Sequence, residues 1–275
     1  MADLPALTRQ IGTKGIFEVH ADQAPRRQTH SMRIVALSDQ HGFLPEVPPC
    51  DLLIVGGDVC PDRFGPFMAM HAPEHQRAWF DRSVRPWLAN ASATHKLLTW
   101  GNHDWCGQAC SFRSDSPACA RSTDLQILVD ERTAVPVGTS GGILSVWATP
   151  WSNRFMHWAF MKDPCDLETI YAAIPAGTDI LVSHQPPHGY GDRAFNLDSG
   201  QIEHAGSREL LAAIERVHPR IVICGHIHGG FGRFEHLGIP IYNVSVVDEQ
   251  YRLVNAPTVI DVNVPASGRP SREPS

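Results

Sequence analysis

The sequence predicts an α/β fold in which layered sheets are covered by helices, and two observations carry this prediction. The first is a series of short, nearly continuous apolar segments rich in Val, Ile and Leu, which is typical of strands buried on both faces. The second is that amphipathic helical patterns lie between some of these segments. The two patterns together are typical of sheets with helices packed on their faces.

Seven segments carry the strand pattern. They are "MRIVALSD" (32–39), "DLLIVGGD" (51–58), "HKLLTWGNHD" (95–104), "GILSVWAT" (142–149), "TDILVSH" (178–184), "RIVICGH" (220–226) and "GIPIYNVS" (238–245). Their apolar residues are contiguous rather than alternating, so both faces of each strand are expected to be covered.

Two segments carry the helical pattern. Apolar residues recur at three- and four-residue spacing over 73–89 and over 206–219, which predicts an amphipathic helix in each. In the second segment, Ser207 is a suitable helix start and Pro219 a suitable stop, because serine caps helix N-termini and proline cannot continue a helix.

Length and composition bound the domain organisation. The chain has 275 residues, of which 43% are hydrophobic and 19% charged, so it can bury a sizeable core and is expected to be globular. We expect an N-terminal extension over 1–32, one folded domain over 33–264 and a disordered tail over 265–275. The tail sequence "PASGRPSREPS" is rich in Pro, Ser and charge, which disfavours a packed core.

Charge and cysteine content limit the partners and the compartment. The net charge of −6 argues against a general nucleic-acid or anionic-membrane binder, whereas a small anionic substrate remains compatible. No run approaches the ~18 apolar residues of a transmembrane helix, and the first residues lack an apolar leader segment. The seven cysteines are scattered, which favours a reducing cytosol and a cytoplasmic location. Cys106, Cys110 and Cys119 cluster, but an ordinary loop is favoured over a zinc site because a fourth ligand is missing.

Polar side chains follow five of the predicted strands at the point where each strand ends. They are Asp39 and His41, then Asp58, then Asn102 with His103 and Asp104, then His184, and finally His226 with His228. In an open α/β sheet, ligands bind in the crevice beyond the carboxyl ends of the strands. Each motif alone is more often a simple turn, but five in one chain, each after a buried strand, indicate one shared metal site.

The side-chain types indicate the metal chemistry. A mixed set of Asp, His and Asn without Cys suits Mn, Fe, Co, Ni or Zn as an active-site ion, rather than structural zinc or an all-oxygen calcium site. The set is too large for one ion, so we expect two divalent ions about 3.5–4 Å apart with Asp58 bridging them. Manganese is the ion expected to support activity in an assay.

The order of these motifs resembles the calcineurin-like metallophosphoesterases, whose fold is a four-layer α-β-β-α sandwich of two mixed sheets flanked by helices. The resemblance implies that the first metal is held by Asp39, His41, Asp58 and His228, and the second by Asp58, Asn102, His184 and His226. It also implies that His103 is the catalytic histidine beside the metals and that Asp104 orients it.

A narrower resemblance covers most of the chain after residue 33. Segments such as "ATPWSNRFMHWAF" and "HPRIVICGHIHGGFG" are similar to the vertebrate brain-type metallophosphoesterase domain-containing proteins and their bacterial relatives. That branch is associated with nucleotide phosphodiester substrates, which the resemblance implies here as well. Some vertebrate members carry Gly at the position of His226, so the complete second set implies an active enzyme.

The predicted cluster suits phosphate chemistry. Two divalent ions lower the pKa of a bridging water towards ~7, which makes hydroxide available for in-line attack on phosphorus. His103 is assigned as the general acid that protonates the leaving group, with a purely supporting hydrogen-bonding role as the alternative. Asp104 is expected to bind the other ring nitrogen of His103, or else to be a solvated loop acid.

Other residues are weaker candidates. The candidates for substrate contact are Asn102, His103 and His188, with a plain surface loop as the more common explanation for His188. Asn243 is a candidate for supporting the site from the last strand, or for only ending that strand. Trp105 and Trp158 are candidates for stacking a base, although core packing is more common for tryptophan.

The sequence therefore predicts a two-metal phosphodiesterase acting on a nucleotide or cyclic nucleotide. A phosphomonoesterase with the same site is the first alternative, because the metals act on the phosphate in both reactions. A weakly active nucleotide-binding regulatory module is the second, and the complete ligand set argues against it. DNA exonucleases share these motifs, but they need a basic surface that this acidic chain lacks.

Overall fold

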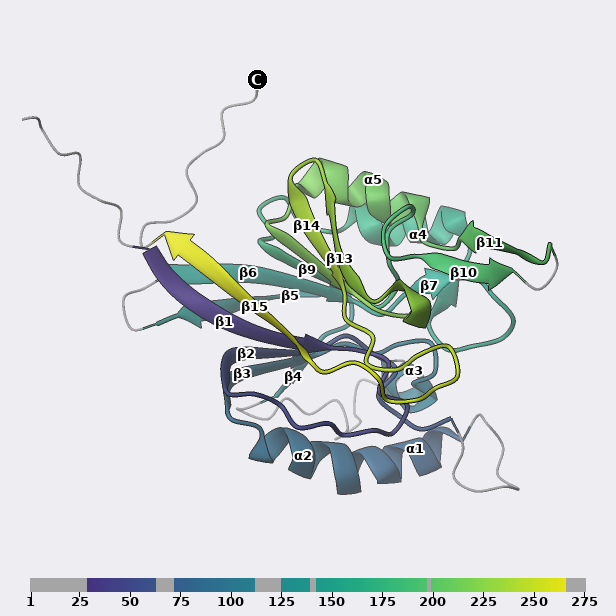
Figure 1. The fold of residues 1–275 in the computed structure, drawn as a ribbon, viewed down its shortest axis with the longest axis horizontal. Coiled ribbons are helices and arrows are strands. Elements are labelled where there is room, and N and C mark those ends of the chain that lie inside the picture. The colour runs from purple at the N-terminus through teal and green to yellow at the C-terminus, as the bar shows by residue number, and fades with distance from the viewer. Residues whose placement is uncertain (1–28, 63–71, 112–124, 139–141, 197–198, 266–275) are drawn as a thin grey trace, which may run out of the picture.

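A computed structural model of the chain describes residues 29–62, 72–111, 125–138, 142–196 and 199–265. Two large sheets face each other in the middle of the molecule, and helices cover their outer faces (Figure 1). The expected four-layer sandwich is therefore confirmed.

The first sheet contains five strands in the order β15-β1-β2-β3-β4. Their bounds are β15 Thr258–Pro265, β1 Thr29–Leu37, β2 Cys50–Val55, β3 Ala93–Leu98 and β4 Gln126–Ile127. β1, β2, β3 and β4 are parallel, whereas β15 pairs with β1 in the antiparallel sense. The parallel strands therefore bring their carboxyl ends to one edge of this sheet.

The second sheet contains six strands in the order β13-β14-β12-β9-β6-β5. Their bounds are β13 Gly232–His236, β14 Ile239–Asn243, β12 Ile221–Cys224, β9 Ile180–Ser183, β6 Gly142–Thr149 and β5 Glu131–Val137. The central strands β14, β12, β9 and β6 are parallel. Two short pairs lie outside the large sheets: β7 (Ser152–Asn153) with β8 (Met161–Lys162), and β10 (Arg193–Asn196) with β11 (Gln201–His204).

Helices lie on both outer faces. On the first sheet α1 (Pro73–Trp79), the π-helical turn η1 (Phe80–Val84) and α2 (Arg85–Asn90) form one continuous rod, and on the second sheet α4 (Pro164–Ala172) packs beside α5 (Arg208–Val217) (Figure 1). The wide turn η1 lies just before Pro86, whose ring would clash with the carbonyl four residues earlier in a regular helix. Two short elements follow the strand ends: α3 (Trp105–Ser111) and the 3-10 turn η3 (His228–Gly230).

The central strands of the two sheets bury both of their faces, which explains the continuous apolar segments. In β1, Ile34 and Ala36 pack between the two sheets, whereas Val35 and Leu37 pack under α1 and α2. A third apolar cluster fills the space between the second sheet and the helices α4 and α5. Neighbouring residues of a strand point to opposite faces, so a strand buried on both faces has no face on which polar residues could alternate with apolar ones.

The predicted elements agree with the observed ones. All seven apolar segments contain a strand, and both helical segments contain helices. In α5 the Ser207 side chain accepts a hydrogen bond from the Leu210 N–H, and His218 ends the helix in a left-handed conformation just before Pro219. β5, β15 and α4 were not predicted.

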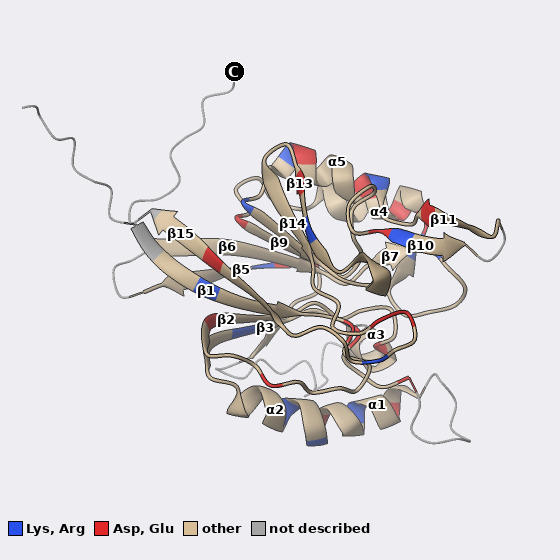
Figure 2. Cartoon of the chain, in the orientation of Figure 1, with Lys and Arg blue, Asp and Glu red and all other residues tan. Residues whose placement is uncertain are grey.

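Acidic and basic residues are interspersed over the described chain, and acidic segments lie on the loops beside α3 (Figure 2). β1 begins at Thr29, inside the extension expected over 1–32, while residues 1–28 and 266–275 lie outside the described residues. Among the described residues, no helix is long and apolar enough to cross a membrane.

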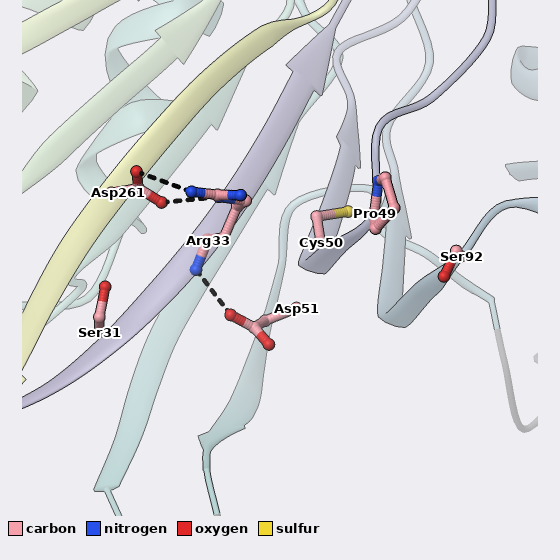
Figure 3. A pocket seen from close by; sticks show the side chains of 7 residues that line it. All are labelled: Ser31, Arg33, Pro49, Cys50, Asp51, Ser92 and Asp261. Carbon is pink, nitrogen blue, oxygen red and sulfur yellow. Dashed lines mark hydrogen bonds and ion pairs between the residues drawn. The ribbon is translucent and has the colours of Figure 1, made fainter.

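A pocket of about 420 Å³ lies at the amino-terminal edge of the first sheet. Arg33 is central to it, but its guanidinium already binds Asp261 at 3.0 Å and its backbone N–H donates to Asp51 at 2.7 Å (Figure 3). Because the polar strand ends lie at the opposite edge of this sheet, the pocket is separate from the site described next.

Candidate metal centre

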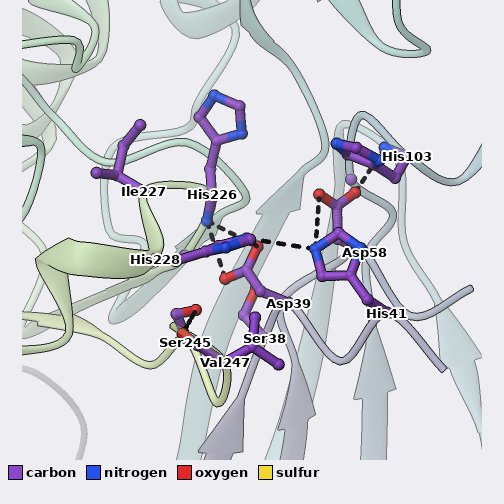
Figure 4. Close-up of polar contacts among 12 residues, drawn as sticks. Ser38, Asp39, His41, Asp58, His103, His226, Ile227, His228, Ser245 and Val247 are labelled. Atoms are coloured by element: carbon purple, nitrogen blue, oxygen red, sulfur yellow. Dashed lines mark hydrogen bonds and ion pairs between the residues drawn. The ribbon is translucent and has the colours of Figure 1, made fainter. Parts of the chain in front are cut away.

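The five polar strand ends converge between the carboxyl edges of the two sheets. β1, β2 and β3 deliver their motifs from the first sheet, and β9 and β12 deliver theirs from the second. The expected ligand side chains are buried or partly buried, and Figure 4 shows several of them pointing into one space. Burying carboxylates and imidazoles together is unfavourable unless they bind one another or a cation.

Three groups of donor atoms form within this space; one joins His41 with Asp62 and His103, and the other two contain the expected ligands. The atoms within 4.8 Å of one another belong to Asp39, His41 and His228 in the first group and to Asp58, His184 and His226 in the second. Asn102 joins the second group, because its Oδ1 lies 2.9 Å from the His184 Nε2. The two histidines of "CGHIHGG" thus join different groups. Metal binding by these residues stays a prediction.

The first group is arranged for a cation because two lone pairs face each other. His228 Nδ1 lies 3.1 Å from the backbone carbonyl of Asp248, and a carbonyl can only accept, so Nδ1 carries the proton. His41 Nδ1 lies 3.3 Å from a carboxylate oxygen of Asp62, which fixes the same tautomer. In the neutral rings the Nε2 atoms of His41 and His228 are then both acceptors, and they face each other at 3.3 Å. A divalent cation would satisfy both.

In the second group, too, a ring nitrogen faces atoms that can only accept hydrogen bonds. His184 Nδ1 donates to the Gly56 carbonyl at 2.9 Å, so the neutral ring presents a lone pair at Nε2. That Nε2 faces the Asn102 Oδ1 at 2.9 Å and the Asp58 Oδ2 at 3.3 Å, which are acceptors too. The same Asp58 oxygen lies 3.9 Å from His41 Nε2 in the first group. Asp58 is therefore positioned between the two groups, where a bridging ligand would have to lie.

The charges within the cluster shift the pKa values of its members. Burial alone would lower the pKa of His184, but the charge of Asp58 and its contact with the ring raise that pKa to about 9. Burial would raise the pKa of Asp58, yet the charges of His184 and His103 hold it well below its usual range. Burial and the neighbouring charge of His184 lower the pKa of His226. This ring therefore stays neutral and keeps a lone pair that can bind a metal ion. The donor set of carboxylate, imidazole and amide groups fits divalent metal ions.

The backbone of four expected ligands lies in the left-handed region. The φ angles are 57° for Asp39, 42° for His41, 51° for Asp58 and 66° for His226. Such angles are uncommon outside glycine and cluster at functional sites, where surrounding contacts maintain them. Here the Asp39 N–H donates to the Gly57 carbonyl and the His41 N–H to the Asp58 carbonyl, each at 2.9 Å.

Two motif glycines allow the ligands to approach closely. A Cβ atom on Gly101 would overlap the Asp58 carboxylate, and one on Gly225 would overlap the Asp39 carboxylate. The backbone N–H of His226 donates to both carboxylate oxygens of Asp39 at 3.0 Å, which holds the "GHIH" turn against β1. The glycines in "GNHD" and "GHIH" are therefore required by packing around the carboxylates.

His103 lies beside the two groups, but its partner differs from the expected one. Its Nδ1 lies 2.7 Å from an oxygen of Asp62, and its backbone N–H donates to Asp58 at 2.7 Å. The pKa of His103 is raised, since the charges of Asp58 and Asp62 outweigh its burial. Asp62 was missed in the sequence, although it follows Asp58 by four residues in "GDVCPD".

The expected contact between Asp104 and His103 is wrong. The Asp104 carboxylate is fully buried and accepts hydrogen bonds from the backbone N–H groups of Val59, Cys60 and Gly101 at 3.0 to 3.3 Å. It is also not a solvated loop acid. Asp104 ties the turns that follow β2 and β3 together through these backbone contacts.

Aromatic rings surround His103. Trp158 stacks on it with the ring centroids 4.1 Å apart and an interplanar angle of 29°. Tyr251 lies 4.6 Å from the His41 ring and 5.0 Å from the His228 ring, in edge contacts. Trp105 instead packs into the apolar cluster beneath α1 and α2. No local pattern in the sequence marked Tyr251.

Asn243 supports the "CGHIHGG" turn. Its Nδ2 lies 2.9 Å from the carbonyls of Gly191 and Ile227 and 3.3 Å from that of Gly225, and its Oδ1 accepts from the Ser245 N–H. Asn243 is 1% exposed, so these carbonyls depend on it rather than on water. Asn243 therefore stabilises the turn and does not merely end the strand.

His188 lies in a neighbouring polar cluster. Its Nδ1 is 3.9 Å from the Asp192 carboxylate, whose other oxygen binds His204 at 2.7 Å. A substrate contact by His188 stays a prediction.

Among the cysteines, the Cys106 Sγ lies 3.7 Å from the Cys60 Sγ, and in the described part of the chain no group of three metal donors includes either thiol. Cys119 lies outside the described residues.

Residues 32–230 match the sequence profile of the family described as calcineurin-like phosphoesterase. This match spans well over half of the chain, and the fold and the donor groups described above agree with it. The chain therefore belongs to the calcineurin-like phosphoesterase family.

Similar proteins support this family membership, and a solved structure supports the fold. Human metallophosphoesterase domain-containing protein 1 is 35% identical over 85% of this chain and 72% of its own length. The UPF0046 protein T07D4.2 of Caenorhabditis elegans is 25% identical over 85% of this chain, which spans only 60% of that protein. The crystal structure of TT1561 from Thermus thermophilus has a TM-score of 0.50 at 14% identity, covering 84% of this chain and 98% of that one. The last similarity shows the fold alone.

Proposed function

We propose that this chain is a two-metal phosphodiesterase that hydrolyses nucleotide or cyclic-nucleotide phosphodiesters. The observation that carries the metal dependence is the pair of facing acceptors at 3.3 Å, His41 Nε2 and His228 Nε2, together with the equivalent contact of His184 and Asn102. Membership of the calcineurin-like phosphoesterase family supports phosphoester hydrolysis. The diester preference rests on the sequence resemblance to the branch associated with nucleotide phosphodiesters.

The residues divide into two ligand sets in this proposal. Asp39, His41, Asp58 and His228 would hold the first ion, and Asp58, Asn102, His184 and His226 the second. When bound, two divalent ions polarise phosphate oxygens and lower the pKa of a coordinated water. Manganese is the ion proposed for reconstitution, with iron, zinc, cobalt and nickel as the other ions that suit this donor set.

His103 would then move the proton. Its Nδ1 is held by Asp62 at 2.7 Å, so its Nε2 is the atom available to a leaving group. Stacking on Trp158 fixes the plane of the imidazole ring. The Asp62 carboxylate at Nδ1 stabilises the protonated ring, as a general acid requires.

A substrate panel tests this function. Manganese-reconstituted protein is assayed with 2′,3′- and 3′,5′-cyclic AMP, AMP, bis(p-nitrophenyl) phosphate and p-nitrophenyl phosphate, with Asp58→Asn as the inactive control. Faster turnover of the diesters supports the proposal. Faster turnover of AMP and p-nitrophenyl phosphate would identify a phosphomonoesterase instead. Nucleotide binding without turnover of any ester would favour a regulatory module. A cytoplasmic location stays a prediction from the cysteine usage.

A further inference from the structure

A short turn after β14 places one aromatic side chain against the first donor group. The Asp248 side chain accepts hydrogen bonds from the backbone N–H groups of Gln250 and Arg252 at 3.0 and 2.9 Å, and the Arg252 side chain binds the same carboxylate at 2.7 Å. The Tyr251 N–H donates to the Asp248 carbonyl at 2.9 Å. Tyr251 has a φ of 58°, so the turn is held in an uncommon conformation that aims this one side chain.

The ring of Tyr251 meets three histidines. Its centroid lies 4.6 Å from that of His41, 5.0 Å from that of His228 and 6.4 Å from that of His103. The contacts are edge-type, with interplanar angles of 71°, 87° and 64°. The residue nevertheless keeps 41% of its surface exposed. Tyr251 is therefore a partly exposed aromatic residue beside the imidazoles of the first donor group.

The turn and the donor group are also connected through the backbone. The carbonyl of Asp248 is the acceptor that fixes the tautomer of His228, at 3.1 Å. Tyr251 therefore cannot move far without disturbing that ligand. Trp158, the other ring near His103, is stacked on the imidazole face at 4.1 Å and serves to hold it.

We propose that Tyr251 is a specificity-determining residue, whose ring stacks with a planar aromatic group of the phosphoester, such as a nucleobase. This inference rests on the proposed function for the position of the phosphate. Every base has an aromatic face, so stacking tolerates different bases and favours aromatic over aliphatic esters. The ring of Tyr251, rather than its hydroxyl, is the part that matters.

Direct binding tests the proposal without turnover. Calorimetry on the manganese-loaded protein compares phenylphosphonate with methylphosphonate, and the methylene phosphonate analogue of AMP with that of ribose 5-phosphate, because none of these C–P bonds is an ester. Each pair differs in one planar group. Wild-type protein should prefer the aromatic member. Tyr251→Ala should reduce that preference about tenfold in at least one pair while leaving the aliphatic member unchanged.

Control variants separate stacking from damage to the site. Tyr251→Phe should retain the preference, and Phe195→Ala, which removes a 57% exposed ring from β10, should leave all four affinities unchanged. Tyr251→Leu replaces the alanine variant if that one fails to fold. An unchanged preference in both pairs, or equal weakening of aromatic and aliphatic ligands, would overturn the role of Tyr251. Absence of turnover with a Tyr251-dependent preference would overturn the proposed function alone.

Discussion

The imidazole of His103, the proposed proton donor, contacts Asp62, with the Nδ1 atom 2.7 Å from a carboxylate oxygen. The two residues are 41 positions apart in the chain and meet because β2 and β3 are parallel neighbours that end at the same edge. Asp62 also lies 3.3 Å from His41 Nδ1, so one carboxylate orients both a ligand and the proton donor.

Asp62→Asn should lower kcat for esters with poor leaving groups about 10- to 100-fold, because such orienting partners contribute that much. Asparagine keeps the size of the side chain but removes the charge. Steady-state kinetics on alkyl esters measure the effect. Asp163→Asn, at an exposed acid before α4, is the matched control and should change nothing. Wild-type kcat in Asp62→Asn would contradict the orienting role.

His103→Ala should leave both metals bound but slow alkyl esters by ~10²–10⁴-fold, with a much smaller effect on nitrophenyl esters. A good leaving group departs without protonation, so general-acid assistance matters little for it. Kinetics across a series of leaving groups, together with elemental analysis for metal content, measure both effects. Equal losses across the series would mean that His103 positions the phosphate instead.

Asp58→Asn should lower activity more than about 100-fold, since even residues that only support a ligand contribute 10–100-fold. Its Oδ2 lies 3.3 Å from His184 Nε2 in the second donor group and 3.9 Å from His41 Nε2 in the first. Exhaustive chelation should have the same effect on the wild type, with recovery on addition of Mn²⁺. Full activity after metal loss, verified by elemental analysis, would refute the two-metal mechanism.

His226→Gly should weaken only the second metal, because His226 shares a donor group with Asp58 and His184 and not with Asp39. We expect a loss of about 10- to 100-fold in metal affinity, partly rescued by more metal. His184→Ala should behave in the same way. Anomalous scattering from His226→Gly crystals at limiting metal locates the remaining ion. Retention beside Asn102 with loss beside Asp39 would reverse the assignment of the two histidines.

Asn243→Ala should destabilise the fold and loosen the metal ligands together. The side chain is buried and binds carbonyls of Gly191, Gly225 and Ile227, so removing it leaves acceptors unsatisfied at a cost of about 1–3 kcal/mol. Urea denaturation and metal titration measure the two effects. Asn263→Ala, at an exposed position of β15, should change the free energy of unfolding by less than about 0.5 kcal/mol. Wild-type stability in Asn243→Ala would show that the turn forms without this side chain.

The sequence by itself determined the buried strands and the candidate ligands that follow them. Segments such as 32–39 and 220–226 combine an apolar run with a polar end, and both features are local. Parallel packing then brings such ends to one edge, which general sheet geometry already implies. The candidate ligands can therefore be predicted from the sequence alone.

Only the tertiary structure decided which of those residues touch. Asp104 follows His103 in the sequence, yet its side chain caps backbone N–H groups, while Asp62 reaches His103 from another strand end. Tyr251 meets His41 across 210 positions of the chain, and its placement depends on a left-handed turn. Contacts of this kind depend on strand order and on a few backbone angles in connecting turns, which local propensity and spacing do not specify.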